Sequence, residues 1–215
     1  AESVADYLDV ARRWWAAAHA ADPQAIYPLF MWNCLWKAGA SIPHGHAQVS
    51  LTRGMHYAKV EHLRRSAEVY RATTGHDYFA DLFASHRDLG LGIEHRGVRV
   101  LAHLVPIKEK ELILLADRLD DDLAAAVYTA LHCLTSTLNM TSFNLVIYHP
   151  PLVPGTDGTG WQDFPVVVRM VDRGDPMNRT ADFGAMELYA ASVISSDPFK
   201  VAEKLFRCFN AERGA

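Results

Sequence analysis

Residues 39–48 read Gly-Ala-Ser-Ile-Pro-His-Gly-His-Ala-Gln, and they carry the strongest structural signal in the chain. Successive side chains of a β-strand point to opposite faces, so a strand over this segment places His44, His46 and Gln48 on one face. The residues between them are glycine and alanine, which leave room for a close approach from the other side. The sequence therefore predicts a strand that carries a polar row of two imidazoles and one amide.

This polar row suits chemistry at phosphorus. A neutral imidazole is a good nucleophile toward phosphorus near pH 7, and a covalent phospho-histidine divides one transfer into two displacements. An amide such as that of Gln48 can donate a hydrogen bond to a phosphate oxygen without supplying or removing a proton. The row therefore predicts a phosphoryl-transfer site with an imidazole nucleophile and an amide donor.

Two other interpretations of the row stay open. Many metal sites also begin with His-x-His on a strand, and His149, His56 or Glu61 could supply further ligands. The row could instead be a structural polar edge, with His44 bonded to a backbone carbonyl. Each alternative requires partners that the sequence does not bring together.

The composition indicates one large domain and excludes several classes of partner. Half of the 215 residues are apolar, which is enough to bury a substantial core. The net charge is -4, and no basic stretch predicts binding to a nucleic acid, although a free nucleotide needs only a few local donors. No apolar run is long enough for a membrane helix, and no signal peptide begins the chain. We therefore expect one domain over residues 1–215, with no nucleic-acid or membrane partner.

The three cysteines, Cys34, Cys133 and Cys208, are few and far apart. They offer neither a disulfide framework nor a Cys-x-x-Cys metal motif, which is typical of a reducing cytoplasm. We therefore expect a cytoplasmic protein.

The apolar periodicity predicts helices and clustered strands. Helices are expected over residues 3–20, over 60–71, along the apolar positions between 123 and 138, and from Asp197-Pro198 onward. Strands are expected over residues 26–33, 44–52, 92–105 with a turn at 95–97, 111–116, 142–149 and 164–171. The alternating charges of residues 108–111 and the Arg64-Arg65 pair are typical of solvated faces. Strand clusters separated by helices favour an α+β fold with a mostly antiparallel sheet flanked by helices.

The stretch from Asn33 to Gln48 resembles the galactose-1-phosphate uridylyltransferase branch of the histidine-triad superfamily. That branch has an asparagine eleven residues before the first motif histidine and a Gly-x-Ser-x-x-His run into it, here Asn33, Gly39, Ser41 and His44. It also has glutamine where the histidine-triad hydrolases have a third histidine. The resemblance implies a histidine-triad-like fold.

The resemblance also implies a role for each matching residue. His46 is the expected nucleophile, and Gln48 steadies the covalent intermediate. Asn33, Gly39, Ser41 and His44 are expected to bind the nucleotide or its phosphates, and Asn144, in a Ser-Phe-Asn strand, joins them. For Asn33 and Asn144 a purely structural role at a strand edge remains an equal alternative. The expected partners are a nucleotide or nucleotide-sugar donor and a phosphorylated acceptor.

The chain departs from the branch at three places. Trp161-Gln162 is followed by Asp-Phe-Pro-Val where a His-x-His pair of a structural iron site is usual. Val193 stands where a hexose-contacting glutamine is expected. The usual zinc ligands belong to a first structural half. Residues 1–55 match only the end of that half, and residues 56–215 match the second half. No cofactor is therefore certain, although zinc with His44 as a ligand stays open, and galactose is not the expected substrate.

The expected function is thus a nucleotidyltransferase that works through His46 and a phosphate or sugar-phosphate acceptor. A phosphorylase of dinucleoside polyphosphates or nucleotide-sugars would use the same row of residues. A nucleotide- or metal-binding protein without catalytic activity is the alternative from another class. An open sheet edge also leaves a homodimer open.

Overall fold

The computed structural model describes residues 2–42, 45–153, 160–179 and 183–212 of the chain. In chain order the elements are α1 (Glu2–Ala21), β1 (Ala25–Cys34), the 3-10 turn η1 (Trp36–Ala38), β2 (Ala47–Arg53), α2 (Ala58–Thr74), α3 (Tyr78–Asp88), β3 (Gly92–His95), β4 (Val98–Ala102), β5 (Leu112–Ala116), α4 (Asp121–Ser136), β6 (Phe143–Tyr148), β7 (Val166–Asp172), α5 (Ala185–Tyr189) and α6 (Pro198–Glu212). None of the helices in these ranges has the length and apolarity needed to cross a membrane.

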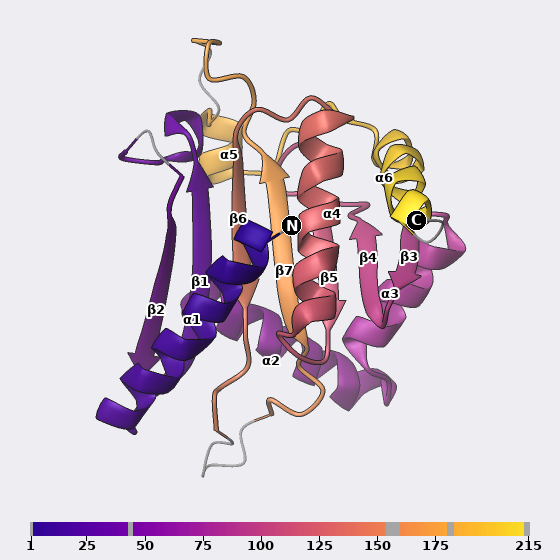
Figure 1. Ribbon diagram of the computed structural model, residues 1–215. Coiled ribbons are helices and arrows are strands. Elements are labelled where there is room, and N and C mark those ends of the chain that lie inside the picture. The colour runs from indigo at the N-terminus through magenta and orange to yellow at the C-terminus, as the bar shows by residue number, and fades with distance from the viewer. Residues whose placement is uncertain (1, 43–44, 154–159, 180–182, 213–215) are drawn as a thin grey trace.

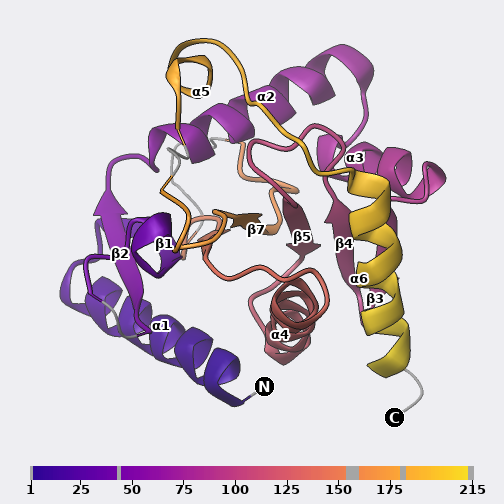
Figure 2. The ribbon, with the colours of Figure 1, turned by 90° about the horizontal axis from the view of Figure 1, so that it is seen from above.

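The seven strands form one sheet in the order β2-β1-β6-β7-β5-β4-β3, and every neighbouring pair is antiparallel (Figure 1). Helices cover both faces of this sheet. Seen from above, α1, α4 and α6 lie on one face and α2 and α3 on the other (Figure 2). The expected α+β fold with an antiparallel sheet and flanking helices is confirmed.

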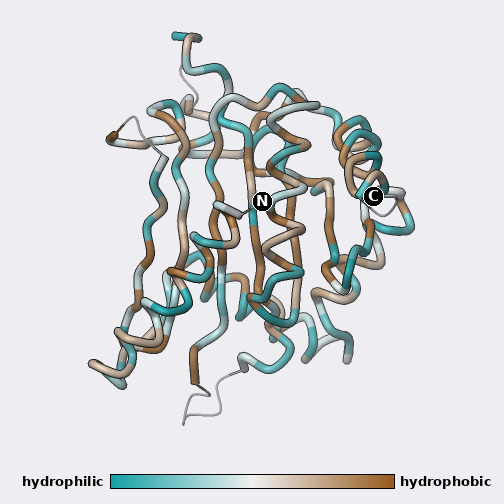
Figure 3. The backbone as a smooth tube through the Cα atoms, viewed as in Figure 1, coloured by the Kyte–Doolittle hydropathy of each residue, from teal (hydrophilic) through white to brown (hydrophobic). Residues whose placement is uncertain are grey.

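The larger core lies between the sheet and α1, α4 and α6. Trp15, Phe30 and Phe209 are among its largest fully buried side chains. The hydrophobic residues concentrate in the central strands (Figure 3). Burial on this scale is the main favourable term in folding, because apolar surface leaves water.

The smaller core lies on the other face, under α2 and α3. It contains Leu29, Phe79, Phe83 and Val167. Helix α3 was not expected, because its aromatic residues are scattered in a polar stretch without a strong helical period. It begins at a cap in which the Asp77 carboxylate accepts the N–H of Phe79 at 3.0 Å. The short helix α5 was not expected either.

The elements that border the site mostly match the expected bounds. Strand β1 and strand β6 lie within a residue or two of the expected ranges, and β1 pairs with β2 in the expected hairpin. Strand β2, however, begins at Ala47 rather than at residue 44. The prediction of a continuous strand from residue 44 was therefore wrong at residues 45 and 46. Residues 43 and 44 lie outside the described ranges, and His46 directly precedes the strand.

Three charged residues that were predicted to face solvent are buried instead, whereas Arg65 is exposed as expected. Lys108 and Glu111 are 7% and 2% exposed, and Arg64 is 7% exposed. Arg64 pairs with Glu61 at 2.9 Å and with Glu68 at 2.8 Å, which compensates the loss of water around its guanidinium. The sequence indicated surface positions because no local pattern shows that Arg64, Lys108 and Glu111 lie inside.

Candidate active site

The site is built where strands β1 and β6 lie side by side at one end of the sheet. Asn33, at the end of β1, is paired in register with Asn144, near the start of β6. The neighbours of both residues along the strands pack into the larger core under α1. Because side chains alternate, Asn33 and Asn144 share the opposite face of the sheet, the one covered by α2 and α3. The two asparagines, 111 positions apart, thus meet directly.

Asn144 is held by three hydrogen bonds that fix its amide. Its Nδ2 donates to Oδ1 of Asn33 at 2.6 Å and to the carbonyl of Ala38 at 2.8 Å. Its Oδ1 accepts from Nη1 of Arg173. Both N–H groups of Asn144 are thus used inside the protein, so this residue positions its neighbours. The role of Asn144 as a direct ligand stays a prediction that the structure does not test.

Asn33 is oriented by that contact. Since its Oδ1 accepts from Asn144, its Nδ2 carries two N–H groups, and no described residue accepts from them. Donors held in place but left unpaired are what a phosphate or a nucleotide carbonyl requires. Asn33 is therefore prepared to donate on the face that it shares with Asn144.

His46 and Gln48 come from the neighbouring strand β2. Gln48 is exposed, opposite Met31 of β1, while Ala47, Val49 and Leu51 pack toward α1. Gln48 therefore projects on the same face as Asn33. The pairing of Trp32 with Ala47 is the last of the ladder. The half-buried His46 immediately precedes Ala47, and Asn33 immediately follows Trp32, so the two residues lie just beyond the same end of the paired strands.

The loop between β1 and β2 contains the other two phosphate-binding candidates. Gly39 follows turn η1 with φ of 87°, a left-handed conformation that glycine adopts without strain, and its N–H donates to the carbonyl of Trp36 at 2.9 Å. Ser41 follows in an exposed bend. Both residues precede His46 in the loop and are exposed. His44 lies outside the described residues.

The candidate metal ligands that the structure describes are engaged in other contacts. His56 accepts the N–H of Tyr57 on Nδ1 at 2.8 Å and donates from Nε2 to the carbonyl of Pro28 at 3.1 Å, so both ring nitrogens are occupied. Glu61 pairs with Arg64, and His149 lies beyond the far end of β6. Among the described residues, no three potential ligands come together. His44 lies outside the described residues, so zinc with His44 as a ligand stays a prediction.

Three cationic or aromatic residues at this end of the sheet were missed in the sequence. Arg173 directly follows β7 and bonds Asn144, while Phe183 precedes α5. The Phe183 ring lies 4.4 Å from Nζ of Lys108 and 5.1 Å from the guanidinium carbon of Arg173. These contacts join segments from three parts of the chain, and only the strand order could have indicated them. They bring positive charge to the end of the sheet that carries the site.

Solved structures share this arrangement of strands. A uridylyltransferase mutant superposes with a TM-score of 0.77 at 15% identity, over 97% of this chain and 71% of its own. The chain has the uridylyltransferase fold. An ADP-glucose phosphorylase from Arabidopsis thaliana superposes with a TM-score of 0.71 at 18% identity, over 92% of this chain and 63% of its own.

The uridylyltransferase fold is shown by structure alone. A GalT-like protein from Arabidopsis thaliana matches at 16% identity with a TM-score of 0.71, over 94% of this chain and 66% of its own. No protein-family model and no curated protein sequence matches the chain. The resemblance inferred from residues 33–48 is confirmed at the level of the fold, and the roles of the individual residues stay predictions.

A buried ionic network braces the uridylyltransferase fold beside the site. The Glu111 side chain is fully buried and accepts from Nε of Arg169 at 2.8 Å, from Nδ1 of His103 at 3.1 Å and from the N–H of Ile107 at 2.8 Å. Burial alone would raise the pKa of Glu111, but the His103 bond, the Arg169 charge and the Ile107 N–H outweigh it and lower that pKa. Glu111 is therefore ionised in the folded protein.

Replacing Asn144 with alanine should loosen the site and destabilise the protein. The change leaves the Ala38 carbonyl, Oδ1 of Asn33 and Nη1 of Arg173 without their partner. We expect a loss of about 2 kcal/mol in the free energy of unfolding, measured by urea denaturation. The matched control is Asn210→Ala, at an exposed position on α6. Equal stabilities of the two variants would show that the three bonds contribute nothing.

Proposed function

We propose that this protein is a nucleotidyltransferase that moves a nucleoside-phosphoryl group through a covalent intermediate on His46. The acceptor in this proposal is a phosphate or a sugar-phosphate. The observation that supports the proposal is the pairing of β1 with β2, which ends at Trp32–Ala47 and leaves the oriented donors of Asn33 and the ring of His46 each one residue beyond that last pair. The likeness to a uridylyltransferase and an ADP-glucose phosphorylase supports nucleotidyl transfer as the general class of reaction.

In the first step the lone pair of a His46 ring nitrogen attacks the α-phosphorus of the donor. A P–N bond forms, and the bond from that phosphorus to the bridging oxygen breaks. The leaving phosphate or sugar-phosphate takes the electron pair of the broken bond. A neutral imidazole is required, since a protonated ring nitrogen has no lone pair to donate.

In the second step a phosphate oxygen of the acceptor attacks the same phosphorus, and the P–N bond breaks back to the imidazole. A phosphate oxygen is already anionic near neutral pH, so the attack needs no general base. Water is a poor nucleophile without a base, and the amide of Gln48 cannot take a proton. Gln48 therefore favours transfer to phosphate over hydrolysis, while its N–H stabilises the charge on the non-bridging oxygens.

A phosphorylase is the second candidate, and the ADP-glucose phosphorylase among the structural neighbours favours it. In this version inorganic phosphate is the acceptor and a nucleotide-sugar or dinucleoside polyphosphate is the donor. The covalent step on His46 is the same, and only the acceptor differs. Val193 is 55% exposed, on the segment where the resemblance expects a hexose-contacting glutamine, so galactose is not the proposed sugar.

The decisive experiment looks for the covalent intermediate. The protein is incubated with a panel of nucleotide-sugars and dinucleoside polyphosphates, one donor at a time, and intact-mass spectrometry measures the added mass. We expect an acid-labile adduct of one nucleoside monophosphate with one donor, which disappears when inorganic phosphate or a sugar-phosphate is added. Nucleotide binding without an adduct from any donor would reject the transferase and support a binding protein.

Replacing Gln48 with alanine should slow the transfer and leave the fold intact. The side chain is exposed, and no described residue bonds its amide, so stability should change little. Loss of one donor to the transition-state oxygens typically costs about 10²-fold in rate. Rapid-quench measurement of adduct formation checks this value, with Gln24→Ala as an exposed control in the turn before β1. A Gln48→Ala rate equal to that of the control would remove Gln48 from the mechanism.

A further inference from the structure

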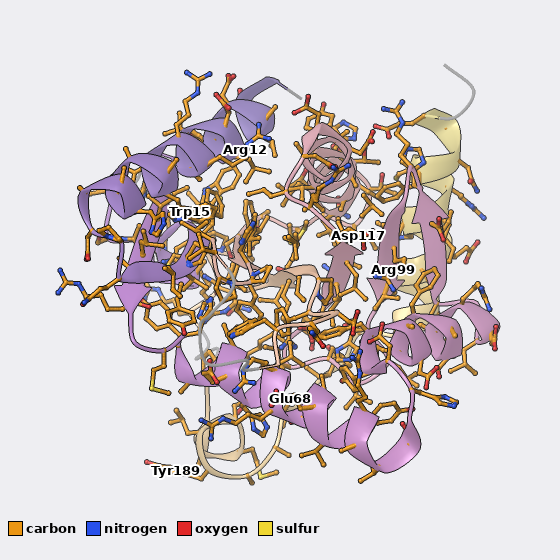
Figure 4. All side chains as sticks on the ribbon, turned by 90° about the horizontal axis from the view of Figure 1, so that it is seen from below. Arg12, Trp15, Glu68, Arg99, Asp117 and Tyr189 are labelled. Carbon is orange, nitrogen blue, oxygen red and sulfur yellow. The ribbon has the colours of Figure 1, made fainter. Side chains whose placement is uncertain are left out.

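A cavity lies at the opposite end of the sheet from His46, on the face covered by α1. It has a volume of about 490 Å³, which is in the range of small-molecule sites. His149 lines it and follows Asn144 by five residues along β6, so the two ends are roughly 17 Å apart. Figure 4 views this end, with Arg12 and Trp15 on α1 and Asp117 across from them.

Part of the wall of this cavity is apolar and buried, while Arg12, His19 and Arg118 also line it. Trp15, Leu119 and Val166 line it and are 1%, 7% and 1% exposed. Trp15 is fixed further by its indole N–H, which donates to the carbonyl of Ser50 at 3.0 Å. A flat, largely apolar molecule fits such walls without rearrangement of the core.

The inner part of the cavity presents an acceptor. Nδ1 of His149 lies 2.6 Å from the carbonyl of Pro150, and a carbonyl only accepts, so Nδ1 carries the proton. Burial lowers the pKa of His149, which keeps the ring neutral and leaves Nε2 as a lone-pair acceptor. No described residue donates to this Nε2. The occupant of the inner part therefore requires an N–H donor.

The mouth of the cavity carries both signs of charge. Asp117 is an exposed carboxylate that no described residue pairs with. Arg12 lies within 3.4 Å of Asp9 and 3.8 Å of Asp121, and Arg118 lies 3.9 Å from Asp120. The arginines are thus compensated by nearby acids, so the mouth has no excess positive charge for a phosphate. The free carboxylate instead suits a group with hydroxyl donors.

We propose that this cavity binds an uncharged nucleoside whose base carries an exocyclic amino group. The amino group donates to Nε2 of His149, the flat base lies against the apolar walls, and the ribose hydroxyls donate to Asp117 at the mouth. Nothing in this assignment depends on the reaction at His46.

Isothermal titration calorimetry with adenosine tests the assignment on the whole protein. We expect one adenosine per chain, with a Kd at least about tenfold weaker for inosine, because its carbonyl oxygen faces the acceptor of His149. Adenosine monophosphate should bind no more tightly than adenosine. Failure of adenosine to bind at millimolar concentration, or equal affinity for inosine, would overturn the proposal.

Two variants locate the binding. His149→Phe keeps a ring but removes the acceptor, and it should abolish the preference for adenosine over inosine. Asp117→Asn is exposed and does not disturb the fold. It should weaken the binding of adenosine several-fold but leave the binding of 2′,3′-dideoxyadenosine unchanged. The control is Asp122→Asn, which is exposed at the same end and should bind adenosine as the wild type does. Adenosine binding that survives both changes but is lost in Asn33→Ala would place the nucleoside in the candidate active site and overturn the proposal.

Discussion

Replacing His46 with alanine is expected to abolish the covalent adduct and to lower the transfer rate by at least about 10⁴-fold. The physical reason is that the change removes the lone pair that forms the P–N bond. Nucleotide binding should persist, since the donors of Asn33 and Gln48 remain. Intact-mass spectrometry measures the adduct, and a coupled steady-state assay measures the rate.

The control for this prediction is His62→Ala, an exposed histidine on α2 away from the strand hairpin. It should form the adduct at the wild-type rate. Free imidazole added to the His46→Ala variant should restore part of the rate, because the small base can occupy the space of the lost ring. An adduct of unchanged yield in His46→Ala would assign the nucleophile to another residue.

Replacing Glu111 with glutamine should cause the largest loss of stability. The glutamine amide is neutral, so Arg169 keeps its positive charge but loses the negative charge that paired with it. The amide nitrogen also meets donors in either orientation, the Ile107 N–H and Nδ1 of His103 at the position of Oε2, or the guanidinium of Arg169 at the position of Oε1. Breaking a buried pair in this way costs about 3 kcal/mol, which corresponds to a fall of roughly 10 °C in Tm for a chain of this size. Urea and thermal unfolding measure the change.

The matched control is Glu203→Gln, an exposed carboxylate paired with Arg207 on α6, and its effect should stay below about 1 kcal/mol. A double-mutant cycle with Arg169→Met isolates the energy of the pair. The double variant should lose less free energy of unfolding than the two single variants lose together. Equal losses in Glu111→Gln and Glu203→Gln would show that burial adds nothing to the Glu111 pair.

The Glu111 carboxylate also makes the free energy of unfolding depend on pH. The folded protein lowers the pKa of Glu111 below its ordinary value of 4.5, so the folded state binds this proton less readily than the unfolded state. The stabilisation is therefore complete above about pH 4.5 and is lost as the pH falls through the lower, folded-state pKa. In the Glu111→Gln variant this part of the acid dependence should be missing from the pH profile of the free energy of unfolding.

The elements with strong periodicity could be predicted from the sequence. The apolar stripe of α4 indicated that helix directly, as did Asp197-Pro198 for α6. Helix α3 was missed because Phe79 and Phe83, although they have helical spacing, stand in a short segment that follows a polar stretch. The start of β2 was misplaced because alternation alone does not say where pairing with β1 stops.

The site could be predicted only in part. His46, Gln48 and Asn33 were found because their spacing matches a motif. Arg173 and Glu111 were not, because their partners are set by the order of strands in the sheet. That order places β6 between β1 and β7, although long stretches of chain separate them. The charges at residues 108–111 were assigned to the surface for the same reason, since no local pattern reveals a distant partner.

The indole of Trp15 has a consequence for how the protein opens. Strand β2 lies at the edge of the sheet, and Trp15 on α1 binds the carbonyl of Ser50 within it. Edge strands usually fray first, but here β2 cannot detach without also losing its hydrogen bond to the N-terminal helix. The backbone amides of β2 should therefore exchange their hydrogens for deuterium in step with those of α1. A loosened N-terminal helix would then impair the site without contributing a residue to it.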